Sequence, residues 1–178
     1  DVIPDSVTSI GEGAFEDCTS LTSITIPDSV TSIDSHAFED CTSLTSITIP
    51  ENVMNIGESA FDGCAGLTSI HIPKKVKKIG EGVFNGCAGL TSITVAEDNP
   101  VYDSREGCNA IIDKSTDRLM FGCRNTVIPS SVTDIEEYAF QGCKNLKEIV
   151  IPDSVESIGD SAFQGCEELK EIVIPESV

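Results

Sequence analysis

The stretch from Pro27 to Ile49, PDSVTSIDSHAFEDCTSLTSITI, returns with small changes along almost the whole chain. A shift of 23 residues aligns prolines, phenylalanines, cysteines and leucines in separate columns. The prolines of this register are Pro4, Pro27, Pro50, Pro73, Pro129, Pro152 and Pro175. A fixed period of about 20 to 50 residues is typical of a solenoid, in which stacked copies bury what one copy cannot. We therefore predict one repeat domain over residues 1–178, built from seven units.

Each unit contains two patterns that suit short extended segments. Leu21, Ile24 and Ile26 form the pattern L-x-x-I-x-I, which predicts a strand, and its copies should form one parallel sheet with one strand per unit. The following proline ends this strand, and Val30 with Ile33 predict a second extended segment.

The rest of each unit suggests a turn. Ala37, Phe38 and Cys41 have the spacing of a single helical turn that places the phenylalanine in the core. Glycine follows the second segment in four units, where we expect a positive φ. These residues are Gly11, Gly57, Gly80 and Gly159, and Asp34 and Glu136 hold the same column. The expected fold class is an α/β solenoid with one parallel β-sheet face and short extended and helical turns opposite.

The consensus I-P-x-x-V-x-x-I-x-x-x-A-F-x-x-C-x-x-L-x-x-I-x-I resembles the BspA-like leucine-rich repeats, a family found chiefly in bacterial surface and secreted proteins. The resemblance covers regular units at 4–95 and 129–174. It implies a leucine-rich-repeat arc with the strands on one face. It also implies adhesion or protein interaction at the cell surface or outside the cell, rather than catalysis, and it names no ligand.

Residues 96–128 form an irregular unit of 33 residues that lacks the proline, the Ala-Phe pair and the leucine. Residues 108–112 and 118–121 predict two strands around a four-residue loop, 114–117. This register places Asp113 opposite Arg118 and, further along, Cys108 opposite Cys123. We expect either a disulfide between these cysteines, worth about 3 kcal/mol for a loop of about 15 residues, or two free thiols that fill the layer.

The other six cysteines share one repeat position and should stack as a ladder inside the solenoid. They are Cys18, Cys41, Cys64, Cys87, Cys143 and Cys166. Parallel stacked side chains rarely meet the torsions of a disulfide, and buried free cysteine behaves as a small apolar residue. We therefore expect a reduced ladder.

The composition excludes several classes of partner. A net charge of −19 argues against nucleic acid and against an anionic membrane surface. No apolar run is long enough to span a membrane, and the first residues lack the pattern of a signal peptide. The chain starts and stops inside a repeat without a capping unit, so we expect it to be part of a longer protein.

We expect no enzymatic activity, no cofactor and no metal. His36 and His71 are the only histidines, they lie in different columns, and no catalytic or metal-binding motif accompanies them. Carboxylates do form columns, one of them through Glu12, Glu58 and Glu81. Weak divalent-cation binding and a solvated acidic edge are the two readings, and we favour the edge.

The best candidate binding site is the outward side of the L-x-x-I-x-I strands. Alternation along a strand turns the following residues outward: Ser23, Thr25, Ser46, Thr48, Ser69, His71, Ser92, Thr94, Glu148, Val150, Glu171 and Val173. The face changes from hydroxyl-rich to charged with an apolar column, as an extended binding surface could require. Strand propensity alone is the alternative explanation, because Thr and Val both suit a strand.

A second candidate is a basic stripe of Lys74, Lys75, Lys77 and Lys78 on an acidic background. It could bind an acidic ligand, or it could only offset neighbouring carboxylates.

These observations predict an extracellular or cell-surface module that binds a protein or glycan of a host or neighbouring cell through the sheet face. The alternative is a structural spacer that projects another domain from the cell surface.

Overall fold

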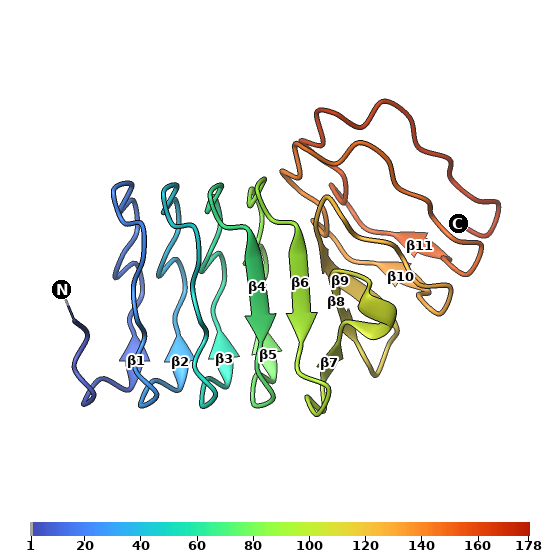
Figure 1. The fold of residues 1–178 in the computed structure, drawn as a ribbon. Coiled ribbons are helices and arrows are strands. Elements are labelled where there is room, and N and C mark those ends of the chain that lie inside the picture. The colour runs from blue at the N-terminus through green and yellow to red at the C-terminus, as the bar shows by residue number, and fades with distance from the viewer. Residues whose placement is uncertain (1) are drawn as a thin grey trace.

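The computed structural model describes residues 2–178, which wind into a β-solenoid of about 7 turns of about 23 residues (Figure 1). The V-x-x-I segments build its most regular sheet. Four of them, β1 (Ser9–Ile10), β2 (Ser32–Ile33), β3 (Asn55–Ile56) and β5 (Lys78–Ile79), pair in parallel in that order. Each isoleucine lies beside its equivalent in the next unit, as in the pair Ile33 and Ile56. The repeat period is therefore also the register of the sheet.

The L-x-x-I-x-I segments pair less extensively than the sequence predicts. Within residues 2–178 only β4 (Ser69–Ile72) and β6 (Ser92–Val95) form a ladder there, so the prediction of one strand per unit in this sheet is wrong. The Thr68 amide donates to the Thr45 carbonyl at 3.4 Å, whereas on the V-x-x-I side the Met54 amide donates to Thr31 at 2.8 Å. The earlier layers are bonded more tightly on the V-x-x-I side, which is where the continuous sheet forms.

The A-F-x-x-C segments are turns rather than helical turns, which corrects the α/β class to a β-solenoid with almost no helix. Within one unit, Glu39 and Cys41 donate their amides three residues back, while Phe38 and Asp40 donate to the next layer at 2.8 and 2.7 Å. A helix would direct all of these amides along its own axis. The only helix in the described part of the chain is the short 3₁₀ segment η1 (Arg105–Gly107).

Two columns of left-handed residues create this alternation. One contains Gly13, His36, Ser59, Gly82, Tyr138 and Ser161, and the other contains Asp17, Asp40, Gly63, Gly86, Gly142 and Gly165, all with positive φ. The expectation of positive φ in the column of Gly57 and Gly80 is wrong, since neither is among the positive-φ glycines. These glycines serve close approach instead, because a Cβ on Gly57 would lie 2.4 Å from the Ser35 nitrogen of the neighbouring layer.

Equivalent side chains stack in the core. Phe15, Phe38 and Phe61 are parallel, with successive ring centroids 5.2 and 5.4 Å apart. The cysteine ladder is reduced, as predicted, and the Cys64 thiol donates to the Phe38 carbonyl at 3.1 Å. The same contact recurs at Cys41, which donates to Phe15.

The irregular unit folds as a three-stranded meander. Strands β7 (Tyr102–Asp103), β8 (Ala110–Asp113) and β9 (Arg118–Gly122) are antiparallel. β9 then pairs in parallel with β10 (Asp134–Ile135), which pairs with β11 (Ser157–Ile158). The predicted hairpin is confirmed, and Asp113 lies opposite Arg118.

The register predicted for Cys108 and Cys123 is wrong by one residue. A bulge leaves Met120 without a partner, because Ile112 pairs with Leu119 but Ile111 pairs with Phe121. The Cys123 thiol therefore lies against the Asn109 carbonyl, at 3.4 Å, and both cysteines are free and buried. The structure thus contains no disulfide between them.

The meander acts as a wedge between the fourth and the last regular units. On the turn side the layers meet directly, since Asn85 donates its side-chain amide to the Gln141 side chain at 2.6 Å. On the other side β7 to β9 intervene, with Ile111 and Phe121 in the N-terminal core and Ile112 and Leu119 in the C-terminal core. The layers that carry β10 and β11 are accordingly tilted away from the first four (Figure 1).

Candidate functional site

The structure places the predicted binding-face residues on the surface. In β4, Ser69 and His71 are exposed while Ile70 and Ile72 are buried. The members that are exposed are Ser23, Thr25, Ser46, Thr48, Ser69, His71, Thr94, Glu148, Val150, Glu171 and Val173, and Ser92 is half-buried. From Ser23 to Thr94 the outward residues of this face are polar, and His71 shares a hydrogen bond of 2.8 Å with the Thr94 hydroxyl.

Three exposed valines follow one another in the last layers, whereas in the earlier layers this position holds a single valine, Val2, at the N-terminal end of the stack. Val127, Val150 and Val173 expose 73%, 82% and 79% of their surface, and they lie at the same position of consecutive layers. We call these three residues the valine row. The sequence reasoning missed Val127 because it closes the irregular unit. Counting back 23 residues from Val150 would have found it.

Carboxylates lie on both sides of the row. Glu148 and Glu171 precede Val150 and Val173 by two residues on the outward side, and Asp153 and Glu176 follow in the next turn, all four exposed. None of these four forms an ion pair with another described residue. The layer of Val127 is neutral at both equivalent positions, which hold Asn125 and Ser130.

The surface is hollowed beside the first two valines. A cavity of about 270 Å³ lies between Val127 and Val150, with Ile128, Ile149 and Pro152 among its lining residues. This volume suits one large apolar side chain. Beyond the glutamates, Arg124, Lys147 and Lys170 form a parallel basic row of exposed residues.

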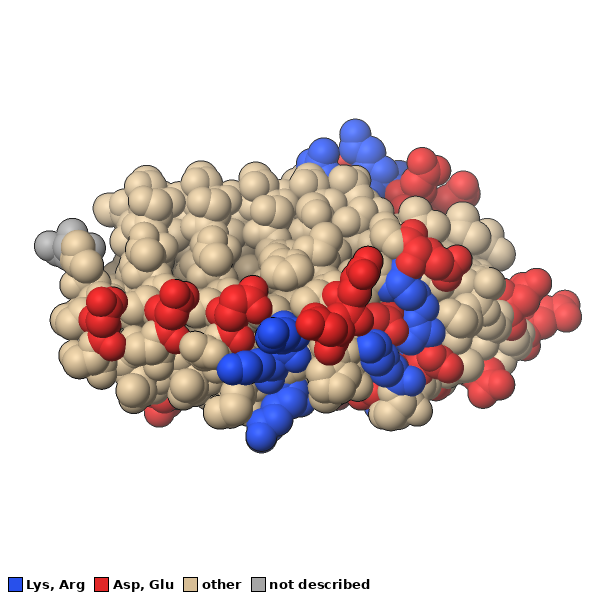
Figure 2. Space-filling model, turned by 60° about the horizontal axis from the view of Figure 1, so that its bottom comes forward, with Lys and Arg blue, Asp and Glu red and all other residues tan. Residues whose placement is uncertain are grey.

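The predicted basic stripe lies on the edge formed by the proline-containing turns. Lys74, Lys75, Lys77 and Lys78 are exposed, and Figure 2 shows positive side chains between groups of carboxylates on this face. Lys75 donates to the Asn52 side chain at 2.7 Å. None of the four is ion-paired within the described residues, so the stripe does not neutralise its acidic neighbours through direct contact.

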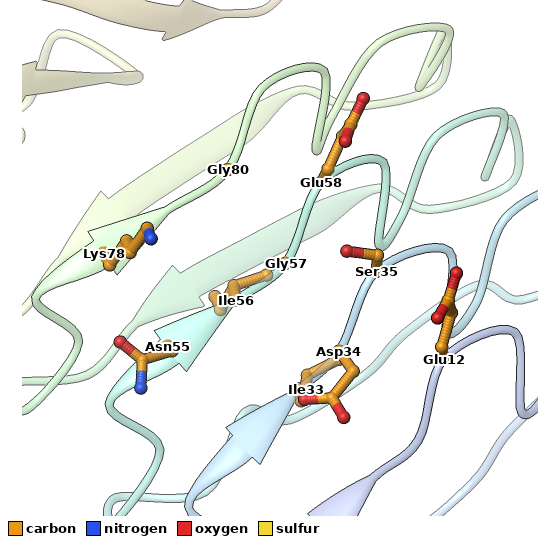
Figure 3. Close-up of a pocket in the computed structure, with 10 residues that line it drawn as sticks. All are labelled: Glu12, Ile33, Asp34, Ser35, Asn55, Ile56, Gly57, Glu58, Lys78 and Gly80. Carbon is orange, nitrogen blue, oxygen red and sulfur yellow. The ribbon is translucent and has the colours of Figure 1, made fainter.

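An open groove of about 640 Å³ lies along β2, β3 and β5, with both polar and apolar residues in its lining. Figure 3 shows Glu12, Ser35 and Glu58 on the loops after the strands, with Asn55 and Lys78 on the strands themselves. These side chains point in different directions and do not converge on a point. The groove therefore has the character of a solvated edge.

Acidic side chains also gather beside His36. Glu39 raises the pKa of His36 through a side-chain hydrogen bond. Burial, with Glu39 and Asp40 nearby, raises the pKa of Asp62 to about 6. Within residues 2–178 no group of three or more His, Cys, Asp or Glu side chains could hold a metal ion.

The thiols are poor nucleophiles. Burial raises the pKa of Cys64 to about 12 and that of Cys108 to about 11. The thiolate is the reactive form of cysteine, so these buried thiols stay protonated and react slowly at neutral pH. The described chain also contains no helix that is both long and apolar enough to cross a membrane.

Comparisons with known proteins agree with this architecture. The model of the BspA type leucine rich repeat region matches residues 2–105 and 119–178 in 6 copies. A leucine-rich repeat protein from Eubacterium ventriosum is 31% identical with a TM-score of 0.76, and the match covers 96% of this chain and 52% of that one. A leucine rich cell surface protein from Faecalibacterium prausnitzii is 36% identical with a TM-score of 0.69, with coverage of 95% and 52%.

A leucine-rich repeat protein of T. pallidum is 33% identical with a TM-score of 0.59, and the match covers 94% of this chain and 63% of that one. The chain thus spans between half and two thirds of the length of these solved structures. No curated protein sequence matches it. Because the repeat model matches most of its residues, the chain belongs to the BspA-type leucine-rich repeat family.

Proposed function

We propose that this chain is a protein-interaction module of an extracellular or cell-surface protein and that the valine row is the centre of its contact surface. The observation that carries this proposal is the exposure of three stacked valines, each at 73% or more. Contiguous exposed apolar surface with a polar border marks interaction sites in soluble proteins. A solenoid presents such a surface as an extended strip.

Strand propensity does not account for the valines. The same column holds Val2 in the first unit and then Thr25, Thr48, His71 and Thr94, so a polar side chain satisfies the backbone at this position as well as valine does. Valine in place of threonine exchanges the hydroxyl for a methyl group and so exposes more apolar surface to water, which is unfavourable unless a partner buries it. Valine side chains offer no hydrogen bonds to sugar hydroxyls, and we therefore favour a protein over a glycan as the partner.

The proposed location rests on relatives. The family is one of bacterial surface and secreted proteins, and the 36% identical structure from Faecalibacterium prausnitzii is described as a cell surface protein. We propose the same location for the protein that contains this chain.

The test is binding of the wild-type chain and of the variant V127T/V150T/V173T to a panel of extracellular-matrix proteins and mucins at low and physiological salt. Threonine is native to this column, so the variant should keep the fold, and its melting temperature provides the check. We expect at least one saturable interaction that survives physiological salt and weakens about tenfold or more in the variant, which corresponds to about 1.4 kcal/mol. Equal affinity of the wild type and the threonine variant for every bound protein would contradict the proposal.

A structural spacer is the second candidate. The nearly identical first three layers, whose parallel strands and stacked phenylalanines repeat without variation in register, favour it. A spacer should tolerate the threonine variant in every binding assay.

A further inference from the structure

We propose that the valine row receives one face of a basic amphipathic α-helix of a partner protein, with the helix axis parallel to the direction in which the layers stack. This inference rests on the proposed function, because it names the partner element for the same surface. Spacing, charge and the hollow beside Val150 support it separately.

The spacing of the row matches a helix. The Phe140 and Phe163 rings of the last two regular layers have centroids 5.0 Å apart. At this spacing the two steps from Val127 to Val173 cover about 10 Å along the stack, close to the separation of neighbouring strands. A helix presents residues i, i+3 or i+4, and i+7 on one face, and i to i+7 spans about 10.5 Å. An extended strand presents outward residues about 6.7 Å apart, so its third outward residue lies about 13 Å from its first and overshoots the third valine.

The charges select a basic helix. Glu148 and Glu171 lie about 6.6 Å from their valines on one side, at the rise of two strand residues. Asp153 and Glu176 lie on the other side, and all four carboxylates are exposed and free of ion pairs within the described chain. A helix about 10 to 12 Å wide would place lysine or arginine on each flank near these carboxylates. In the neighbouring basic row Lys147 pairs with Glu168 at 3.9 Å, and within the described chain no residue of this row pairs with the four carboxylates, which therefore stay available to a basic helix.

The hollow gives the helix an anchor. The cavity of about 270 Å³ between Val127 and Val150 has Ile128, Ile149 and Pro152 in its wall, and Glu148 at its rim. A leucine or phenylalanine of the helix stripe would fill it, in the manner of a central anchor residue surrounded by a polar rim. Asn125 and Ser130 carry no charge at the equivalent positions of the Val127 layer, so the basic flanks need extend only along the last two layers.

The experiment uses two synthetic peptides of identical composition. One has leucine at i, i+4 and i+7 with lysine on both flanks, and the other has the same residues permuted so that no apolar stripe forms. Fluorescence anisotropy measures their binding to the wild-type chain, to V127T/V150T/V173T and to E148Q/E171Q/D153N/E176Q. A control variant, K74Q/K75Q/K77Q/K78Q, changes a distant surface by the same number of charged residues.

We expect the striped peptide to bind the wild type and the lysine control alike and to bind the valine and carboxylate variants about tenfold more weakly, with a gain of helical circular dichroism on binding. Equal binding of the permuted peptide would overturn the inference, because charge alone would explain it. Failure of both peptides, together with a panel protein whose binding depends on the valines, would overturn the helix but keep the proposed function. If neither peptide binding nor panel binding depends on the valines, both the helix inference and the proposed function are wrong. Valine-dependent dimers in sedimentation would assign the surface to a second copy instead.

Discussion

The backbone amide of Gly86 donates to the carbonyl of Gln141 at 3.1 Å, across the whole irregular unit. The same bond joins Gly63 to Asn85 between adjacent regular units, at 2.8 Å. On the turn side, therefore, the solenoid continues as if residues 96–128 were absent. The meander fills only the opposite side, and this asymmetry produces the tilt of the last layers and the break between the polar face and the valine row.

The close contact at this junction predicts that Gly142→Ala destabilises the fold. Gly142 has φ +74°, and an added Cβ would lie 2.6 Å from the Gly86 Cα. We expect a loss of about 1 to 3 kcal/mol in the free energy of unfolding, measured in urea. Gly11→Ala is the matched control, because no atom lies within 4 Å of its Cβ position, and it should change stability by less than about 0.5 kcal/mol. Similar losses in both variants would refute this account of the junction.

Arg105 should hold the meander in place. Its guanidinium donates to Asp103 at 2.8 and 2.9 Å, to Asp117 at 2.7 Å and to Ser131 at 3.1 Å. Arg105→Gln leaves both carboxylates without their shared partner, so we expect a loss of about 1 to 3 kcal/mol in chemical unfolding.

Arg118→Gln is the control for that change. Arg118 makes one bond to Glu136, at 3.1 Å, and its side chain is 43% exposed. It should cost less than about 1 kcal/mol, as exposed ion pairs usually do. An equal effect of the two substitutions would argue against a special role for Arg105.

Stability should fall as the pH rises from acidic to neutral in the region of Asp62. Burial raises the pKa of its carboxyl to about 6 from an ordinary 3.8, so the folded state binds a proton more tightly than the unfolded state. The stabilisation is present below pH 3.8 and is lost progressively as the pH rises through about 6. His36, whose pKa is raised by Glu39, contributes in the same direction through its own titration.

Thermal melts between pH 4 and 8 test this linkage. Asp62→Asn removes the ionisable group, so the variant should lose part of the decline in Tm and should melt above the wild type at neutral pH. Asp5→Asn is a control at an exposed turn and should leave the profile unchanged. A wild-type profile that is flat or rises over this range would contradict the prediction.

Thiol titration of the unfolded, unreduced chain should count eight cysteines, all of which are free in the structure. A count of six would show that Cys108 and Cys123 form the disulfide that the hairpin pattern suggested. In the native state we expect slow reaction at the ladder, because burial raises the pKa of thiols such as Cys41, to about 11.

The sequence by itself determined the layer period, the residues that point inward and the parallel register. Residues such as Ile33 and Ile56 can bury their side chains only against their equivalents one period away, so the repeat carries this information directly. It also indicated the hairpin of the irregular unit and the exposure of Val150 and Val173.

Tertiary structure decided the features that depend on which layer or strand a backbone amide forms its hydrogen bond with. The spacing of Ala37, Phe38 and Cys41 fits a helical turn, but the amide of Phe38 bonds to the next layer, which a local pattern cannot reveal. Likewise the bulge at Met120 moves Cys123 away from Cys108. The direct contact of Gly86 with Gln141 sets the continuation of the stack beyond the meander.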